Sequence, residues 1–390
     1  MSAEKHKIAF VMTAGMFLDI FYPDFYPLAE SKGYEIVGIC AADRFVANVT
    51  AQGVRVIEVP MTRTFTPFRD LVCLLKLYRI FRAEKFDLIN YSTPKAALLS
   101  AIAAKTAGST RLLYTVRGLA YTGFSGLKRM IAKGCETIAC RNADTIIAIS
   151  PTLKAQIVEE GLTNAEKIVV YGLGSSKGVN LKTFQCNDQT LQRARQIRKA
   201  LNLSADDVVF GYAGRFTVEK GIIELLDAFE AVSKQSRQAH LLLVGQQDQR
   251  MPLPQSVLDR IDQHRRIHVL PFTADMPAHL AAMDVFVLAS YREGFGNVLI
   301  EASALQRPVI ASDIPGCRDA VKPGLTGLLV SPRNSASLQS AMQTLMADPN
   351  QRQTMGQNGR KWVESAFNRD KIWAWLFEVF ASMLQNPKRT

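Results

Sequence analysis

Two carboxylates, Glu293 and Glu301, are separated by seven residues in a glycine-containing segment that follows an apolar run. The run 284–290 predicts a buried parallel strand, the glycines predict a tight loop, and Asn297 predicts the cap of an apolar-periodic helix. Glu293 would then lie in the loop, and Glu301 would lie about one turn into the helix, roughly 6 Å further along its axis. Free N–H groups at the helix start suit a diphosphate. This set of groups fits a ligand that combines sugar hydroxyls, phosphates and ribose hydroxyls.

Two cations precede this segment. Arg215 and Lys220 lie between Gly214, at the end of a predicted strand, and a helix predicted to begin near Ile222. Arginine presents a planar fork to phosphate oxygens and lysine presents a point charge. Together they could neutralise a diphosphate leaving group; the alternative is two surface cations beside a helix start. No Asp-x-Asp motif follows a suitable strand, and the six cysteines are scattered, so neither a metal nor a cofactor is implied.

The elements that must position these residues alternate between strand and helix, in two series. This alternation predicts an α/β fold with two doubly wound parallel sheets. The expected boundary lies between about 180 and 205, which gives domains at 1–185 and 205–370. Predicted strands are 8–12, 35–39, 55–59, 87–90, 112–116 and 145–149, then 207–212, 240–245, 267–270, 285–289 and 308–311. An amphipathic helix is predicted at 371–384, with an apolar stripe that includes Trp373, Phe377 and Phe380.

Bulk composition describes a well-packed globular protein of 390 residues, with 48% hydrophobic and 21% charged residues. No apolar run of about 18 residues occurs, and the first residues lack a signal-peptide pattern, so a cytoplasmic protein is expected. The net charge is +12, and residues 1–185 carry 23 Lys and Arg against 15 Asp and Glu, or +8. Nucleic acid, an anionic membrane, a phosphorylated substrate or a merely basic surface would each explain this excess.

A basic amphipathic segment runs from Arg63 to Lys85. Such a helix can lie on an anionic membrane surface, although the sequence alone favours a helix packed on the sheet with solvated cations, and a lipid-linked acceptor would favour the membrane. The cations of the segment are Arg63, Arg69, Lys76, Arg79, Arg82 and Lys85.

With these motifs together, the sequence resembles the family 4 retaining glycosyltransferases of the GT-B fold along nearly its whole length. The resemblance implies two Rossmann-like domains that face each other across a cleft, an acceptor domain at 1–185 and a nucleotide-sugar domain at 205–370. The helix at 371–390 would cross back onto the first domain. The motifs that carry the resemblance are Gly214-Arg215, Lys220-Gly221, Glu293 to Val298, Glu301-Ala302, Thr93 to Ala96, Gly174 to Asn180 and Pro308 to Cys317.

The resemblance also implies roles for individual residues. Arg215 and Lys220 would bind the diphosphate, Glu293 the transferred sugar and Glu301 the ribose, and the first three are the expected catalytic residues. Backbone groups of the loop and helix start would hold phosphates and sugar, and Leu270 and Phe272 would lie near the base. The other expected donor contacts are Gly15, Gly214, Gly294, Phe295, Gly296, Asn297 and Val298.

The first domain resembles a subset that builds capsule, O-antigen and glycoprotein glycans on polyprenyl diphosphate. Many relatives have His-Gly where this chain has Arg117-Gly118, so a role for that histidine cannot be transferred. Arg117 would hold donor or acceptor phosphate or form a structural salt bridge, and Lys95 is a second candidate phosphate ligand.

The sequence therefore predicts a metal-independent transferase of a hexose or N-acetylhexosamine. Its donor would be a nucleotide diphosphate sugar, and the resemblance favours the UDP-linked form. The acceptor would be a polyprenyl diphosphate-linked saccharide, reached by peripheral contact with the inner face of an anionic membrane, and nucleic acid is not an expected partner. A soluble acceptor, or a non-catalytic nucleotide-sugar-binding protein, are the alternatives.

Overall fold

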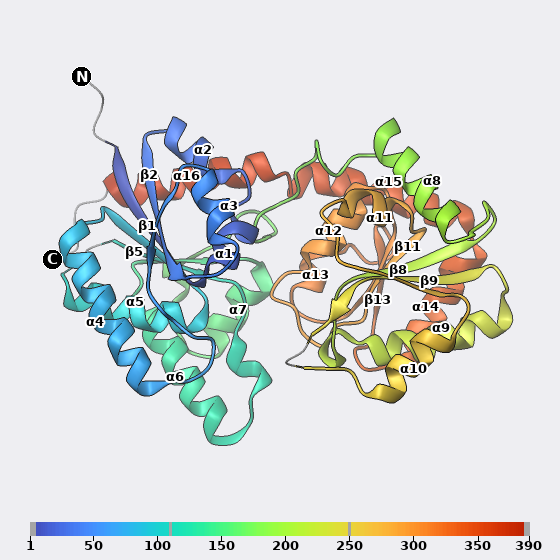
Figure 1. Ribbon diagram of the computed structural model, residues 1–390, viewed down its shortest axis with the longest axis horizontal. Helices are drawn as coiled ribbons and strands as arrows, with labels where there is room; N and C mark the ends of the chain where they lie inside the picture. Colours follow the sequence, from blue (N-terminus) through green and yellow to red (C-terminus); the bar gives the residue numbers. More distant parts are fainter. Residues whose placement is uncertain (1–4, 109–110, 249–250, 386–390) are drawn as a thin grey trace. The chain divides into compact units, whose positions relative to one another are not determined.

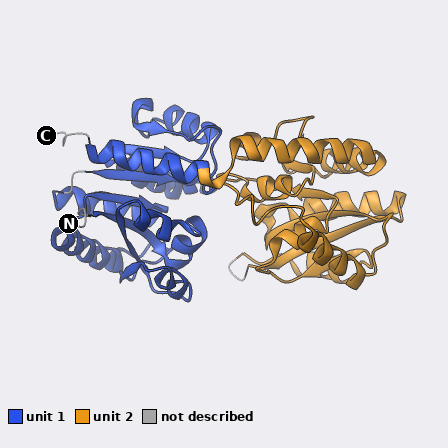
Figure 2. Cartoon of the chain, turned by 90° about the horizontal axis from the view of Figure 1, so that it is seen from above, with its two compact units in different colours: residues 1–177, 371–390 blue, residues 178–370 orange. Residues whose placement is uncertain are grey.

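The computed structural model describes residues 5–108, 111–248 and 251–385. The chain forms two compact units, which Figure 2 colours separately. Unit 1 comprises Met1–Lys177 with Lys371–Thr390, and unit 2 comprises Gly178–Asp370. The predicted first domain extended to residue 185, but the chain enters unit 2 earlier. Val179 pairs there with Asn368, and its N–H donates to the carbonyl of Phe367 at 2.8 Å.

The described part of unit 1 contains one seven-stranded sheet in the order β3-β2-β1-β4-β5-β6-β7. Neighbouring strands pair in parallel, as the strand–helix alternation predicts. The strands are β1 (His6–Ala14), β2 (Tyr34–Ala41), β3 (Arg55–Glu58), β4 (Leu88–Ser92), β5 (Leu112–Val116), β6 (Thr145–Ala148) and the two-residue β7 (Ile168–Val169).

Helices cover both faces of this sheet (Figure 1). One face packs on α1 (Gly15–Phe21), α2 (Phe25–Ser31), α3 (Val46–Ala51) and α16 (Arg369–Gln385), around a core that includes Phe10, Phe25 and Phe380. The other carries α4 (Pro67–Glu84), α5 (Pro94–Thr106) and α6 (Gly126–Asn142). The remaining helical segments are η1 (Ala120–Gly123), α7 (Pro151–Glu159) and η2 (Ala165–Lys167).

Unit 2 is built on the same plan, with six parallel strands in the order β10-β9-β8-β11-β12-β13 among its described residues. These strands are continuous apolar runs because helices bury both faces of the sheet. They are β8 (Val208–Phe216), β9 (Ala239–Gln247), β10 (Ile267–Leu270), β11 (Val285–Leu288), β12 (Val309–Ser312) and β13 (Gly327–Val330).

The helices of unit 2 lie before, between and after its strands along the chain. They are α8 (Asp188–Ala200), η3 (Val218–Lys220), α9 (Ile222–Gln235), α10 (Gln255–Gln263), α11 (Met276–Ala281), α12 (Asn297–Ala304), α13 (Cys317–Ala320), α14 (Ser335–Ala347) and α15 (Pro349–Ala366). The predicted two-sheet α/β fold is confirmed. Strands β7 and β13 were not predicted. Strand β7 has only two residues, too few to show an apolar period, and the four residues of β13 begin with a glycine, a residue type depleted in strands.

Candidate donor site in unit 2

The strand order of the second sheet reverses between β8 and β11. Ligands of open parallel sheets bind outside the carboxyl ends of the strands at such a reversal. The loops after these two strands carry Lys220 and Glu293, and α12 begins four residues after Glu293. The topology therefore brings together a cation and a carboxylate that are far apart in the sequence.

Lys220 and Glu293 form an ion pair at the sheet edge. The Nζ atom of Lys220 lies 2.5 Å from Oε1 of Glu293, and both side chains are largely buried. The hydroxyl of Ser290 donates to the same carboxylate oxygen at 2.8 Å. Ser290 was not predicted, because a serine that ends an apolar run carries no signal of its own. The pair brings together two of the three predicted catalytic residues.

Two glycines let the surrounding loops approach closely. Gly221 has a φ of +71°, and a Cβ there would lie 2.0 Å from the carbonyl oxygen of Ala289. Gly316 has a φ of +82°, and a Cβ there would lie 2.8 Å from the carbonyl oxygen of Gly294. Only glycine adopts these angles without strain and leaves room for the neighbouring backbone. The loops after β8, β11 and β12 consequently pack directly on one another.

Arg215 lies within β8, which extends beyond Gly214 to Phe216, so the prediction that the strand ends at the glycine is wrong. Pairing with β9 explains the extension, since Arg215 is opposite Gln246. The guanidinium forms an ion pair with Asp248 and remains mostly exposed, whereas Asp248 is largely buried. Asp248 was not predicted as this partner, since it lies in a different strand–loop segment.

Two buried side chains that can lose a proton, Cys317 and Tyr212, lie near Glu293. Burial raises the pKa of the Cys317 thiol well above its usual range, and the Glu293 carboxylate raises it further. Burial likewise raises the pKa of the Tyr212 phenol, with a second contribution from Glu293. Both groups stay protonated at neutral pH. Neither therefore supplies an anionic nucleophile beside the carboxylate.

The segment from Phe295 to Glu301 differs in one respect from its prediction. Asn297 is the first residue of α12, and Gly296 holds the cap position without a side-chain hydrogen bond. Phe295 is buried, and its ring packs on that of Phe367 with centroids 5.5 Å apart. Glu301 lies half-buried on the second turn of α12. The position of Glu301 along the helix agrees with the predicted spacing, whereas capping by the Asn297 side chain is wrong.

Leu270 and Phe272 lie at and just beyond the end of β10, the edge strand two places from β8. Leu270 is half-buried, and the side chain of Phe272 is 70% exposed. An exposed aromatic ring can stack on a planar base. Contact with the base remains a prediction for both residues.

The ammonium of Lys95 in unit 1 is bound by oxygen atoms of the protein itself. Its ammonium donates to Asp70 Oδ1 at 2.6 Å, to the hydroxyls of Thr62 and Thr66, and to the carbonyl of Thr64. An ammonium has three N–H donors, and these four acceptors engage them all. Lys95 thus ties the loop before α4 to α5, which argues against its predicted phosphate role.

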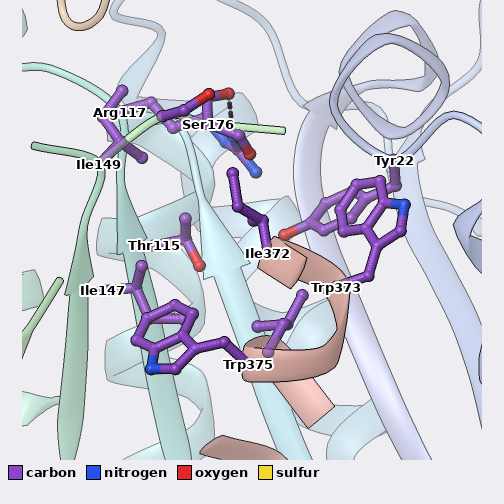
Figure 3. Close-up of a pocket in the computed structure, with 11 residues that line it drawn as sticks. Tyr22, Thr115, Arg117, Ile147, Ile149, Ser176, Ile372, Trp373 and Trp375 are labelled. Atoms are coloured by element: carbon purple, nitrogen blue, oxygen red, sulfur yellow. Dashed lines mark hydrogen bonds between the residues drawn. The ribbon is translucent and has the colours of Figure 1, made fainter. Parts of the chain in front are cut away.

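Arg117 lines a small pocket at the end of β5 (Figure 3). Its Nη1 donates to the Ser176 hydroxyl at 2.6 Å, and its guanidinium lies 3.9 Å from the centroid of the Phe21 ring. Its Nε is buried without a hydrogen-bond partner. None of the described carboxylates forms an ion pair with Arg117, so the salt-bridge alternative is wrong. The phosphate role stays a prediction.

The same pocket explains how the last helix joins unit 1. Trp373 and Trp375 of α16 line it together with Tyr22, and Trp373 is buried against the Tyr22 and Phe25 rings. Trp373 is thus a packing residue, as its place on the predicted apolar stripe indicates. Thr115, Ile147 and Ile149 complete the strand side of the pocket.

Gly15 begins α1 in close contact with α3. A Cβ on Gly15 would lie 2.6 Å from both Oδ1 of Asp43 and Cγ2 of Val46. The N–H of Met16 donates to Asp43 at 2.9 Å. One N–H group of this loop is therefore already bonded within the protein, and the donor contact of Gly15 remains a prediction.

In residues 5–108, 111–248 and 251–385, no group of three or more His, Cys, Asp or Glu side chains is arranged to hold a metal ion. None of the helices within those ranges is both long and apolar enough to cross a membrane.

Family models match both units. The model described as "Glycosyltransferase Family 4" matches residues 28–174, and the model described as "Glycosyl transferases group 1" matches residues 193–362. The second match contains Arg215, Lys220 and both glutamates.

Named relatives align over most of the chain. A capsular polysaccharide biosynthesis glycosyltransferase, CapM of Staphylococcus aureus, is 36% identical over 330 residues, which cover 85% of this chain and 86% of CapM. The UDP-Gal:alpha-D-GlcNAc-diphosphoundecaprenol alpha-1,3-galactosyltransferase of Escherichia coli is 25% identical over 368 residues. The alignment covers 93% of this chain and 92% of that relative.

Among solved structures, Anabaena HepE in complex with UDP matches with a TM-score of 0.79 at 22% identity. The alignment covers 96% of this chain and 100% of HepE. A similarity at this identity establishes the shared fold.

Proposed function

The chain belongs to glycosyltransferase family 4 of the GT-B fold, and we propose that it is a retaining transferase of a hexose or N-acetylhexosamine from a nucleotide diphosphate sugar. The observation that supports this proposal is the Lys220–Glu293 pair at the strand-order reversal of unit 2. A diphosphate that binds Lys220 replaces the carboxylate as its anionic partner. Glu293 then becomes available to accept hydrogen bonds from sugar hydroxyls.

In the proposed reaction, the bond between the sugar C1 and the diphosphate oxygen breaks while the acceptor oxygen bonds to C1 from the same face. The departing diphosphate takes the proton of the acceptor hydroxyl. Arg215 and Lys220 stabilise the charge that develops on the leaving group, the kind of contact that contributes most to transition-state stabilisation. Glu301 holds the ribose of the nucleotide. These residues carry out the reaction without a resident metal ion.

We infer that the donor is UDP-linked and that the acceptor is a saccharide on polyprenyl diphosphate. The Escherichia coli relative is named for UDP-Gal and a diphosphoundecaprenol-linked sugar, which supports both inferences. A relative from Campylobacter jejuni, 24% identical over 358 residues, is named for a diphospho-undecaprenol-linked acceptor as well. CapM supports a place in the biosynthesis of a surface polysaccharide.

We further propose that unit 1 contacts the inner face of an anionic membrane, where a lipid-linked acceptor would reside. Arg69, Lys76, Arg79 and Arg82 are exposed on α4. Each cation near an anionic bilayer contributes on the order of 1 kcal/mol, and salt screens the attraction. Substituting all four with Gln should weaken binding to anionic vesicles at low salt. Flotation of the variant equal to that of wild type would refute the contact.

A panel of nucleotide sugars tests the donor proposal. The donor should raise the melting temperature of the protein, because a ligand that binds only the native state stabilises it. The same donor should then label a polyprenyl diphosphate-linked saccharide. Lys220→Ala should lower turnover at least about a hundredfold, while Lys361→Ala, which removes an exposed cation of α15, should not change it.

The outcomes separate the alternatives. Transfer only to a water-soluble acceptor would replace the lipid-linked acceptor with a soluble one. A thermal shift without transfer to any acceptor would indicate a protein that binds nucleotide sugars without turnover. The absence of both a shift and transfer would refute the proposed function.

A further inference from the structure

Exposed apolar side chains concentrate at the start of two helices of unit 1. More than half of the large apolar side chains that are exposed in the described residues come from α4 with its preceding loop and from α6. Phe68 is 89% exposed, and Leu127 and Met130 are each 65% exposed. Solitary exposed apolar residues need no explanation, but apolar residues three or four apart on the exposed face of one helix are neighbours, and such groups indicate an interaction surface. We call the following set the apolar edge: Phe65, Phe68, Leu71, Val72, Leu75, Leu127, Met130 and Ile131.

Both parts of the apolar edge lie at the same end of unit 1. Helices α4 and α6 each follow a parallel strand and return the chain to the opposite end of the sheet, so both begin near the carboxyl ends of the strands. Both pack against α5, which lies between them on one face of the sheet (Figure 1). All eight residues belong to the first halves of these helices or to the preceding loop. They therefore flank the end of the sheet at which ligands of parallel sheets bind.

The residues of the apolar edge do not belong to the hydrophobic core of unit 1. On α4 the residues that face the sheet are Cys73, Leu77 and Phe81, and these are buried. On α6 the buried positions are Glu136, Ala139 and Cys140, all in the second half of the helix. The first halves of both helices thus present apolar side chains outward although the core does not require them there.

Positive charge surrounds these side chains. Arg69, Lys76 and Lys128 are exposed among them. The one acidic residue between Arg63 and Lys76 is Asp70, and its carboxylate binds Lys95 at 2.6 Å. Apolar side chains interspersed with cations match the interface of an anionic bilayer, where the apolar face of a helix is buried about 5–10 Å into the boundary between headgroups and acyl chains and the cations meet negative headgroups.

We propose that the apolar edge inserts into the interface of an anionic lipid bilayer, with α6 contributing as much as α4. This inference rests on the proposed lipid-linked acceptor and adds a second mode of attachment to the charge-based contact of α4. Insertion holds the carboxyl end of the unit 1 sheet against the membrane, so a lipid-linked saccharide reaches that end without leaving the bilayer.

Charge also decides between a bilayer and a second copy of the chain as the occupant. A symmetric dimer through this surface would place the cations of one copy against those of the other, because both copies use the same patch. Like charges across an interface oppose association. An anionic bilayer instead neutralises Arg69, Lys76 and Lys128 while it buries the apolar side chains.

Vesicle flotation with the full chain tests the proposal. Wild type should bind vesicles of phosphatidylcholine and phosphatidylglycerol at low salt, and a fraction should stay bound at salt that screens the charges. The variant with Leu127→Gln, Met130→Gln and Ile131→Gln should lose that salt-resistant fraction by about tenfold, because apolar burial does not depend on screening. The control Leu325→Gln changes a similarly exposed apolar residue in unit 2 and should behave as wild type.

Three results would overturn the inference. One is equal salt-resistant binding by wild type and the α6 variant, and another is the absence of salt-resistant binding in wild type. The third is a wild-type dimer in solution that the α6 variant dissociates, which would identify a second copy as the occupant. Flotation does not depend on turnover, so an inactive protein that floats would refute the proposed function alone. A chain active on a soluble acceptor that fails to float would refute the insertion alone.

Discussion

Glu136 is a carboxylate buried beneath the first sheet, and we expect it to make the stability of unit 1 depend on pH. It lies in the second half of α6, where Oε1 accepts a hydrogen bond of 2.5 Å from the Tyr114 hydroxyl. Burial raises the pKa of Glu136 from 4.5 to about 7, and the hydrogen bond from Tyr114 opposes this shift only in part. The pKa of Tyr114 is itself raised by burial, so the phenol keeps its proton.

The sign and size of the effect follow from this shift. Below pH 4.5 Glu136 is protonated in both the folded and the unfolded chain. Between pH 4.5 and about 7 the unfolded chain loses the proton and the folded chain keeps it, so the free energy of unfolding falls as pH rises. Above about pH 7 both states are ionised and the full cost is present. A shift of that size corresponds to about 3 kcal/mol, at roughly 1.4 kcal/mol per pKa unit.

Glu136→Gln tests this expectation, because the amide resembles the protonated carboxyl. The variant should match wild type near pH 4.5 and exceed its free energy of unfolding by about 3 kcal/mol above pH 7. Urea unfolding in a Trp362→Phe background isolates unit 1, since the remaining tryptophans, Trp373 and Trp375, both lie there. Glu159→Gln removes an exposed carboxylate of the same unit and serves as the control.

The comparison of pH profiles decides the outcome. Parallel profiles for wild type and Glu136→Gln would show that the buried carboxyl does not titrate between pH 4.5 and 7, and would refute the reasoning. The control profile should run parallel to that of wild type across the whole range.

Three further predictions concern the donor site. Arg215→Ala should lower turnover at least about a hundredfold, and a folded variant with wild-type turnover would exclude its role at the leaving group. Glu301→Ala should weaken binding of free nucleoside diphosphate, whereas Glu293→Ala should weaken only the sugar-bearing donor; calorimetry that finds equal losses of nucleotide affinity would contradict this division. Gly221→Ala should lower the melting temperature and donor affinity together, because its Cβ would lie 2.0 Å from the Ala289 carbonyl oxygen at a φ of +71°; donor affinity at the wild-type level would show that the loops need no such close approach.

The α/β fold, and the strand, loop or helix on which each candidate donor-site residue lies, could largely be predicted from the sequence because their signals are local. Apolar runs marked β8, β11 and β12. The spacing of Glu293 and Glu301 placed them on a loop and on the second turn of a helix. Such patterns can be recognised in the sequence alone because a buried parallel strand and a helix each have a characteristic spacing of apolar residues along the chain.

Pairings between distant residues could not be predicted in this way. The residues next to Arg215 in the sequence do not indicate that Asp248 is its partner. Those next to Lys95 do not indicate that its ammonium donates to Asp70 and to three threonines. Local propensity also failed for Asn297, where Gly296 holds the cap position. Each of these outcomes depends on which loops the sheet brings to the same edge.

The sequence by itself determined which residues have the chemistry for a nucleotide sugar and which segments become strands and helices. Only the tertiary structure decided which of those residues meet, that Lys220 pairs with Glu293, and that α6 exposes Leu127 and Met130. The physical reason is that hydrophobic periodicity is a property of neighbours along the chain. Burial, ion pairing and exposure instead depend on the packing of segments that are tens of residues apart, and that packing exists only once both sheets have formed.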